Sequence, residues 1–265
     1  MKVIVTGAAG RMGRSIIAAI YEDPNLLLTG VVEKRGNKYI KQDAGILAGV
    51  GSTGLKIIDN IEEVIEEGDV IIEFTDPSAT MEHLKYAHNF NKKMVIGTTG
   101  FSEEQIMQIK NCSQKIPIVL SPNMSMGVNL LFKITNEVTK VLSKDFDIEI
   151  IEAHHHHKKD APSGTAKKLA EIVANTINKD LKEIGVYGRE GLIGERKKDE
   201  IGVLSIRGGD IVGEHTVTFI GEGERIELTH KAHSRMTFAK GALKAAKWLQ
   251  DKDRELYNMN DVLEI

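Results

Sequence analysis

Along the first half of the chain, short and almost continuously apolar runs alternate with segments of helical periodicity. Such runs predict strands buried on both faces, and their alternation with helices predicts a doubly wound parallel sheet. The predicted strands have the sequences KVIVTG, LLLTGVVE, DVIIEF, KMVIGTTG and IPIVLSPN. The predicted helices run up to Ile20, over roughly 78–90 and onward from Ser102.

After Ser125 the pattern changes. A long helix is predicted to about Leu142, followed by the strand DIEIIEAH and a helix over about 163–177. Three runs then succeed one another without intervening helices: GVLSIRG, HTVTFIG and ERIELTHKA. Their alternation of apolar and polar positions predicts an antiparallel or mixed sheet with one face turned to solvent or to a partner. A last amphipathic helix is predicted over 238–249. The fold class is therefore α/β, in two domains that meet near residue 125.

Composition narrows the class of protein. The 265 residues carry a net charge of −3, so a nucleic-acid-binding surface is not expected. The single cysteine, Cys112, cannot form an internal disulfide, which favours a cytoplasmic protein. No apolar run approaches the ~20 residues of a membrane span, and no signal-peptide pattern is present, so no membrane association is expected.

The first predicted strand leads directly into a glycine turn, GAAGRMG, with Gly7, Gly10 and Gly13. A glycine turn followed by a helix start allows close approach to a pyrophosphate and supplies amide donors. The next strand ends at Glu33, about 20 residues later, where an acid can bind the ribose hydroxyls of a dinucleotide. Three glycines between a strand and a helix can also be purely structural. The context favours nucleotide binding.

The residues after Glu33 leave the choice of cofactor open. Glu33 favours NADH, because a carboxylate repels a 2′-phosphate, whereas Lys34 and Arg35 can pair with that phosphate. Lys34 and Arg35 are equally compatible with a solvated cluster of charges in a loop. Two further turns, GTTG at 97–100 and SPNM at 121–124, follow predicted strands. In open parallel sheets ligands bind at the carboxyl ends of strands, so these turns are expected at the cleft.

The most unusual stretch is EAHHHHKKDAPSGTA at 152–166. A zinc site is one interpretation, but neighbouring side chains of a strand point to opposite faces, and no cysteine supports the histidines. We therefore expect no metal. An expression-tag relic is disfavoured because the run is internal and continues a predicted strand, and an exposed polar loop is a further alternative. The preferred interpretation is an anion-binding catalytic site, since histidine titrates near neutrality and lysine adds positive charge.

The segment DAPSGTA resembles a helix start. Pro162 and Ser163 suit the start of a helix, and Gly164 and Thr165 lead into its first turn. Amides there, together with the Thr165 hydroxyl, suit a substrate carboxylate. A proton donor beside a carboxylate cradle, downstream of a nucleotide domain, indicates reduction of an acidic small molecule.

At this point the whole chain resembles a known family, the bacterial 4-hydroxy-tetrahydrodipicolinate reductases of the diaminopimelate route to lysine. The motif E-x-H-H-x-x-K-x-D-A-P-S-G-T-A carries the resemblance, and GAAGRMG, EFT at 73–75, GTTG and RGGDIVGEHTV also match family segments. The resemblance implies a Rossmann-type domain over 1–125 that is completed by the C-terminal helix, 236–265. It also implies a substrate domain over 126–235, whose sheet builds a homotetramer. Reduction with NADH or NADPH is implied as well.

Site residues follow from the resemblance one by one. It makes His154 the proton donor or acceptor, makes Lys158 a proton donor, and assigns His155, Gly164 and Thr165 to the substrate. The implied cofactor residues are Gly7, Ala8, Ala9, Gly10, Arg11, Met12, Glu33, Lys34, Gly97, Thr98, Thr99, Ser121, Pro122, Asn123 and Met124. Lys34 stands where some relatives have arginine for the 2′-phosphate; a lysine keeps the charge but lacks the planar fork of the guanidinium. No family role is implied for His156 and His157.

The implied substrate is a small cyclic dicarboxylate that accepts hydride while a cationic His154 or Lys158 supplies the proton. Two alternatives stand beside this function. One is another two-domain dehydrogenase, acting on an amino acid, keto acid or sugar, which would not explain the DAPSGT cradle. The other is a non-catalytic dinucleotide sensor, which would need a DNA-binding element or partner surface that the sequence does not indicate.

Overall fold

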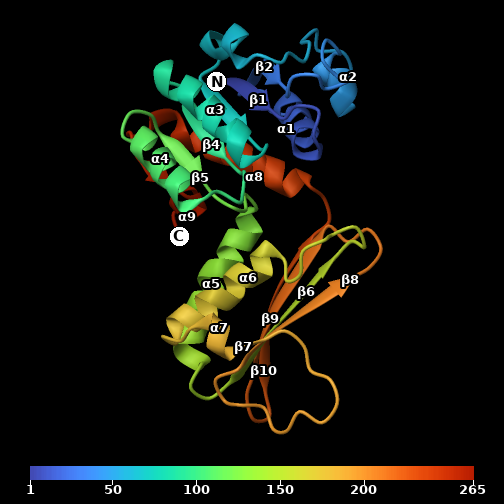
Figure 1. Ribbon diagram of the computed structural model, residues 1–265, viewed down its shortest axis with the longest axis vertical. Helices are drawn as coiled ribbons and strands as arrows, with labels where there is room; N and C mark the ends of the chain where they lie inside the picture. The colour runs from blue at the N-terminus through green and yellow to red at the C-terminus, as the bar shows by residue number, and fades with distance from the viewer. The chain divides into compact units, whose positions relative to one another are not determined.

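The computed structural model describes residues 1–265, which divide into two compact units. Unit 1 comprises Met1–Met126 and Arg235–Glu264, and unit 2 comprises Gly127–Ser234 with Ile265. Figure 1 shows the elements of each unit. The predicted fold class, a Rossmann-type parallel sheet together with a second, mixed sheet, is confirmed.

Unit 1 is built on a six-stranded parallel sheet with the order β11-β5-β4-β3-β1-β2. Since β1 has β2 on one side and β3 on the other, the strand order reverses there, and ligands bind at such a switch point in open α/β sheets. Its strands are β1 (Lys2–Thr6), β2 (Leu27–Val32), β3 (Val70–Glu73), β4 (Lys93–Ile96), β5 (Ile118–Leu120) and β11 (Leu256–Tyr257). Its helices are α1 (Arg11–Tyr21), α2 (Ala44–Ala48), α3 (Pro77–Asn89), α4 (Glu103–Ser113), α8 (Met236–Trp248) and α9 (Met259–Leu263), with short 3₁₀ turns at Ile61–Glu63, Ile65–Glu67 and Leu249–Asp251.

The near-continuous apolar runs arise because both faces of this sheet are covered. Val3 and Val5 of β1 pack into a core with α1, α8 and α9, whereas Ile4 between them belongs to a second core with α3 and α4. All three residues are fully buried. Alternate side chains of the strand enter opposite cores, so a strand that is covered on both faces has no polar position in its centre.

The helix starts of unit 1 carry their own sequence signals. Asp76 caps α3 by accepting hydrogen bonds from the amides of Ser78 and Ala79, and Pro77 occupies the first helical position. Ser102 caps α4 in a reciprocal arrangement with Gln105. These caps fix where the chain turns back from the carboxyl edge of the sheet.

Unit 2 contains a five-stranded sheet with the order β10-β9-β6-β8-β7, in which β6 pairs parallel with β8 and antiparallel with β9. Its strands are β6 (Asp147–His154), β7 (Gly185–Val186), β8 (Ile201–Arg207), β9 (Gly213–Ile220) and β10 (Arg225–Ala232). Its helices are α5 (Met126–Leu142), α6 (Gly164–Thr176) and α7 (Leu181–Ile184). The prediction of a mixed sheet is confirmed.

The two faces of this sheet differ in burial. On one face Ile148, Ile150 and Phe219 pack with α5 and α6 into a buried core. On the other face Ile151, Ile206 and Ile220 are 38%, 52% and 40% exposed.

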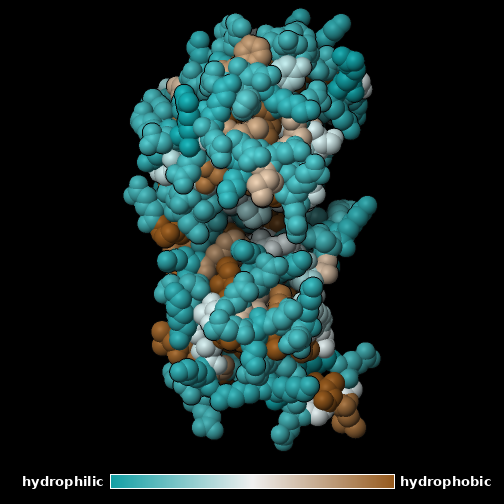
Figure 2. All heavy atoms as spheres, turned by 60° about the vertical axis from the view of Figure 1, so that its left-hand side comes forward, coloured by the Kyte–Doolittle hydropathy of each residue, from teal (hydrophilic) through white to brown (hydrophobic).

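In the view of Figure 2, hydrophilic side chains predominate on the surface and apolar ones appear in small separate groups. No helix is both long enough and apolar enough to cross a membrane.

One premise of the sequence analysis is wrong. The histidine run does not continue the strand, because β6 ends at His154 and residues 155–160, with a turn at 156–157, lie outside any helix or strand; this segment is called the 155–160 turn. Two backbone hydrogen bonds hold this turn against the segment after β8, from His155 to Ile211 (2.8 Å) and from His156 to Gly209 (3.3 Å). The argument that alternating strand faces separate the four histidines therefore applies to His154 alone.

Candidate functional site

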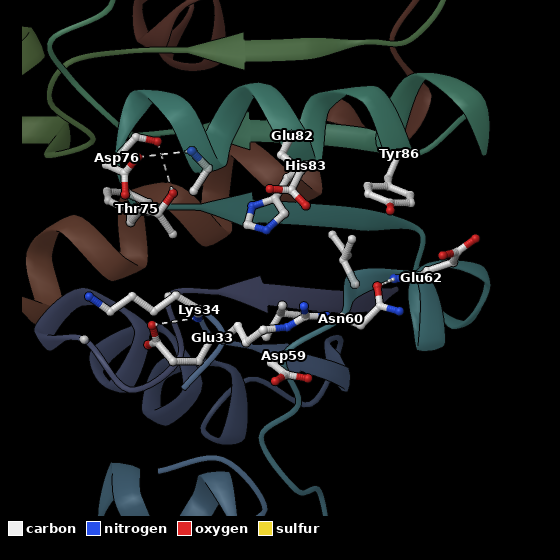
Figure 3. A pocket seen from close by; sticks show the side chains of 17 residues that line it. Glu33, Lys34, Asp59, Asn60, Glu62, Thr75, Asp76, Glu82, His83 and Tyr86 are labelled. Carbon is white, nitrogen blue, oxygen red and sulfur yellow. Dashed lines mark hydrogen bonds between the residues drawn. The ribbon is translucent and has the colours of Figure 1, made fainter. Parts of the chain in front are cut away.

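A pocket of about 680 Å³ in unit 1 opens at the carboxyl ends of β1, β2 and β3. Figure 3 shows side chains of α3 on one side of it, including His83 and Tyr86, and Glu33 and Lys34 on the other. Its lining residues are Gly7, Gly10, Val32, Glu33, Lys34, Arg35, Asp59, Asn60, Ile61, Glu62, Phe74, Thr75, Asp76, Ala79, Glu82, His83 and Tyr86. The glycine turn and the acid predicted to bind a nucleotide thus line one cavity.

The glycine turn is required by close backbone packing. Gly7 has φ +63°, a conformation that favours glycine, and a Cβ there would lie 3.0 Å from Thr75 Cγ2. A Cβ at Gly13 would lie 2.2 Å from the carbonyl oxygen of Gly7. The turn therefore brings bare backbone to the start of α1, the arrangement that accommodates a pyrophosphate.

Glu33 lies directly after β2 with its carboxylate bound by two amides. Its oxygens accept hydrogen bonds from Ala9 N (3.0 Å) and Lys34 N (2.9 Å), which hold the carboxylate beside the glycine turn. Five carboxylates and two basic side chains, Lys34 and Arg35, line the pocket. The positive charges of Lys34 and Arg35 partly compensate the negative charge of these carboxylates.

Glu73, at the end of β3, organises the pocket wall although its side chain is fully buried. Its Oε2 accepts a hydrogen bond from Thr6 Oγ1 (2.8 Å) and lies 2.6 Å from His83 Nδ1, and its Oε1 accepts from the Thr75 hydroxyl. These bonds link β1, β3 and α3 around one carboxylate. The buried Glu73 carboxylate therefore holds the side chains of Thr75 and His83 in place where they line the pocket.

The remaining predicted cofactor residues lie at the same edge of the sheet but do not line this pocket. Gly97 follows β4, and Ser121 follows β5 and donates its amide to Ile96 O (3.1 Å). Thr98 is buried and supports the pocket wall, because its Oγ1 accepts hydrogen bonds from Thr75 N (3.1 Å) and Thr80 Oγ1 (3.0 Å). Ala8, Ala9 and Met124 are buried, Arg11 and Met12 begin α1, and Thr99, Pro122 and Asn123 belong to the two turns.

In unit 2 the predicted catalytic histidine lies at the end of β6 with a buried acid two residues before it. His154 Nδ1 is 2.6 Å from Glu152 Oε2, since residues i and i+2 of a strand share a face. Glu152 is fully buried and also accepts hydrogen bonds from Ser163 N (3.1 Å) and both terminal nitrogens of Arg207 (2.8 Å each). The imidazole is thus held by an anchored carboxylate.

The electrostatics of this group have identifiable causes. Burial raises the pKa of Glu152, but the hydrogen bonds of Arg207 and His154 outweigh it and lower that pKa to about 2. Burial lowers the pKa of His154, Glu152 raises it, and the charges of Lys158 and Arg207 lower it, with a net lowering from 6.5. Near neutral pH, His154 is therefore largely neutral beside an ionised carboxylate.

Lys158 lies on the turn after His154, and its Nζ donates to Asp160 Oδ1 (2.8 Å), which lowers the pKa of Asp160. The same segment leads into α6, where Ser163 Oγ caps the helix by accepting a hydrogen bond from Ala166 N (3.2 Å). Gly164 and Thr165 form the first turn of α6. Amides in a helix's first turn are not used by its own ladder, and the dipole favours an anion there.

His155, His156 and His157 occupy the turn, where the rings of His156 and His157 lie 3.8 Å apart. His156 Nδ1 is 3.0 Å from Gly209 O. No group of three or more histidine, cysteine, aspartate or glutamate side chains is arranged to hold a metal ion. The absence of a functional metal stays a prediction.

Two residues of this site received no role in the sequence analysis, although the segment RGGDIVGEHTV contained both. Arg207 ends β8, and His215 lies on β9 opposite Glu152. Ser163 Oγ is 3.0 Å from His215 Nε2, and the His215 ring meets that of His154 edge-on at 5.2 Å. Burial, followed by the charge of His154, lowers the pKa of His215 to about 3.

The fold and these two groups of residues define a protein of the pyridine-nucleotide-dependent oxidoreductase class, with a Rossmann-type unit and a separate unit that carries acid–base residues. Comparison with known proteins identifies the family within that class. The family model described as dihydrodipicolinate reductase, N-terminus, matches residues 1–124, and the one described as dihydrodipicolinate reductase, C-terminus, matches residues 127–263. The chain belongs to the dihydrodipicolinate reductase family, and the predicted membership and enzyme class are confirmed.

Similar proteins agree with this assignment. A protein of Geotalea uraniireducens (strain Rf4) named 4-hydroxy-tetrahydrodipicolinate reductase is 49% identical over 263 residues, which cover 99% of this chain and 98% of that protein. A structure described as dipicolinate-bound dihydrodipicolinate reductase from Paenisporosarcina sp. TG-14 is 26% identical, with a TM-score of 0.76 and 97% of each chain covered. The amine dehydrogenase of Mycobacterium smegmatis, at 11% identity and a TM-score of 0.59, covers 98% of this chain and 95% of its own and shares the fold alone.

Proposed function

We propose that this protein catalyses the NAD(P)H-dependent reduction of 4-hydroxy-tetrahydrodipicolinate to tetrahydrodipicolinate in the biosynthesis of diaminopimelate and lysine. The observation that carries the proposal is the arrangement in unit 2, where His154 and Lys158 lie on the segment that leads into the helix start at Gly164. The named relative at 49% identity and the dipicolinate in the similar structure support a cyclic dicarboxylate as substrate.

We assign the adenosine part of the cofactor to the pocket of unit 1. The bound cofactor supplies the hydride, and the chain supplies binding and orientation. Glu33 would bind the ribose hydroxyls, and the Gly7–Gly10 turn would lie against the pyrophosphate. The predominance of carboxylates in the wall favours NADH, while Lys34 and Arg35 offset the extra charge of NADPH, so we propose that both cofactors are accepted.

The acid–base residues have separate tasks in this proposal. The substrate first loses its hydroxyl group as water, which leaves a conjugated ring. Negative charge develops on that ring as hydride arrives, and Lys158 supplies the proton with His154 as donor or acceptor. The first turn of α6, with Gly164 and Thr165, would bind a substrate carboxylate that stays charged throughout, and His155 would contact the substrate from the turn. Because burial lowers the pKa of His154, its imidazole is largely neutral at neutral pH.

We further propose a cytoplasmic homotetramer, in which the exposed face with Ile151, Ile206 and Ile220 is covered by another copy of the chain. The proposal rests on the family resemblance and on the alternation of apolar and polar positions along these strands, which gives the sheet a second face that a partner can cover.

The test is to mix the purified protein with NADH or NADPH and follow the loss of nicotinamide absorbance after adding candidate substrates. We expect turnover with freshly prepared 4-hydroxy-tetrahydrodipicolinate and none with amino, keto or sugar acids. Turnover only with one of those acids would favour another dehydrogenase, and binding of NADH without turnover of any substrate would favour a non-catalytic sensor.

A further inference from the structure

The carboxylate of Glu152 accepts hydrogen bonds on both of its oxygens. Oε2 accepts from Arg207 Nη1 (2.8 Å) and faces His154 Nδ1 (2.6 Å). Oε1 accepts from Arg207 Nη2 (2.8 Å) and Ser163 N (3.1 Å). One buried side chain of β6 therefore connects the imidazole, β8 and the start of α6.

This arrangement selects one tautomer of His154. An ionised carboxylate only accepts hydrogen bonds, so His154 Nδ1 carries the hydrogen and Nε2 is the nitrogen that can gain or lose a proton. Space on the Nε2 side is provided by Gly213, where a Cβ would lie 3.0 Å from that atom. The acid thus decides which nitrogen is available for chemistry.

Arg207 holds the turn that carries Lys158. Besides its two bonds to Glu152, its Nη2 donates to the carbonyl oxygen of Asp160 (2.6 Å), the residue whose side chain accepts from Lys158. The planar guanidinium serves both acceptors at once, which the single ammonium of a lysine cannot reproduce.

We propose that Glu152 and Arg207 are positioning residues of the reduction: the carboxylate fixes the Nδ1–H tautomer of His154, and the guanidinium holds the 155–160 turn against β6. This inference rests on the proposed function for its catalytic consequence, whereas the tautomer and the attachment of the turn are independent of it. The charged or titratable groups around His154 are Glu152 on β6, Arg207 on β8, His215 on β9, and Lys158 and Asp160 on the turn.

Glu152→Gln is the sharpest variant because it is nearly isosteric. Whichever way the amide is oriented, its NH₂ group faces two donors, either His154 Nδ1 and Arg207 Nη1 or Ser163 N and Arg207 Nη2. In the first orientation His154 Nδ1 becomes the acceptor, and its hydrogen moves to Nε2. Loss of the negative charge also disfavours the imidazolium.

The chain offers a matched control on the same strand. Glu149 of β6 also accepts a two-pronged bond from an arginine, Arg189 (2.9 Å and 2.9 Å), but no histidine contacts it. Glu149→Gln and Arg189→Lys therefore make the same chemical changes away from His154.

The experiment combines ring-nitrogen NMR of ¹⁵N-histidine-labelled protein, titrated with pH, and steady-state kinetics. For Glu152→Gln we expect His154 to shift toward the Nε2–H tautomer, its titration midpoint to fall by about 1 pH unit or more, and turnover to fall by roughly 100-fold. For Arg207→Lys we expect the tautomer to be retained and turnover to fall at least about tenfold, because the turn is released. Both control variants should keep the wild-type tautomer and titration midpoint of His154.

The proposal is overturned if Glu152→Gln keeps both the wild-type tautomer and midpoint, or if Arg207→Lys keeps wild-type turnover. Should Glu152→Gln fail to fold, Arg207→Lys decides, with faster amide hydrogen exchange across 155–160 as its structural readout. If the wild type reduces no dicarboxylate, the proposed function fails, while the tautomer and exchange measurements still decide the positioning of His154.

Discussion

Removal of His215 should flatten the pH dependence of stability between pH 7 and pH 5. The side chain is only 4% exposed, and burial lowers its pKa from 6.5 to about 3. In this interval the unfolded chain binds a proton at His215 that the folded chain does not, so stability is retained above pH 6.5 and is lost as the pH falls below it. The loss of stability is complete only when the pH approaches the folded-state pKa of His215, about 3.

The magnitude follows from the interval below the unfolded pKa. At pH 5 the site is 1.5 units below its unfolded value of 6.5, and each unit corresponds to about 1.36 kcal/mol. The free energy of unfolding should therefore fall by about 2 kcal/mol from pH 7 to pH 5 through this residue. This figure depends little on the folded pKa as long as that value lies well below 5.

The assay is urea unfolding followed by circular dichroism at fixed protein concentration, at pH 7 and pH 5. His215→Gln keeps a hydrogen-bonding atom near the position of Nε2 and does not titrate, so the variant should lose about 2 kcal/mol less than the wild type over this interval. His233→Gln, at an exposed position, is the matched control and should follow the wild type. Equal pH dependence of His215→Gln and the wild type would refute the buried, neutral state of His215.

Three further predictions concern cofactor, assembly and metal. Glu33→Ala should raise the Kd of NADH more than that of NADPH, because the ribose contact is lost while Lys34 and Arg35 remain; fluorescence titration with both cofactors measures this, and equal changes would contradict the ribose assignment. Sedimentation at micromolar concentration should give a particle well above the 29.2 kDa of one chain, and a fully active monomer would rule out the proposed assembly. Dialysis against a chelator should leave turnover intact, and a loss of activity that zinc restores would show that the histidine run binds a functional metal.

The Rossmann-type sheet could be predicted because its determinants are local. Strand β1, buried on both faces, reads as an unbroken apolar run, and the turn at Gly7 to Gly13 follows it directly. The two-residue strand β11 at Leu256–Tyr257 was not predicted, because two residues carry no period. Its place beside β5 is determined by tertiary pairing.

The group formed by Glu152, His154, Arg207 and His215 was only partly predictable, because part of it depends on the pairing of strands that lie far apart in sequence. Glu152 and His154 share a face through strand geometry, so their contact is implied by their spacing. Arg207 and His215 join them through strand register, since β6 pairs His154 with Arg207 on β8 and Glu152 with His215 on β9. Register between strands more than 50 residues apart in sequence is fixed by packing of the sheet, which periodicity does not reveal.

The central claim is that the stretch from Glu152 to Ala166 delivers the proton of the reduction, and steady-state kinetics on three variants test it most directly. Lys158→Ala and His154→Ala should each lower turnover by about 100- to 10,000-fold with NADH binding near normal, because they act where charge develops only in the transition state. Thr165→Val should mainly raise KM, because the carboxylate it is proposed to contact is charged throughout the reaction. Near-native turnover of both Lys158→Ala and His154→Ala would contradict the account.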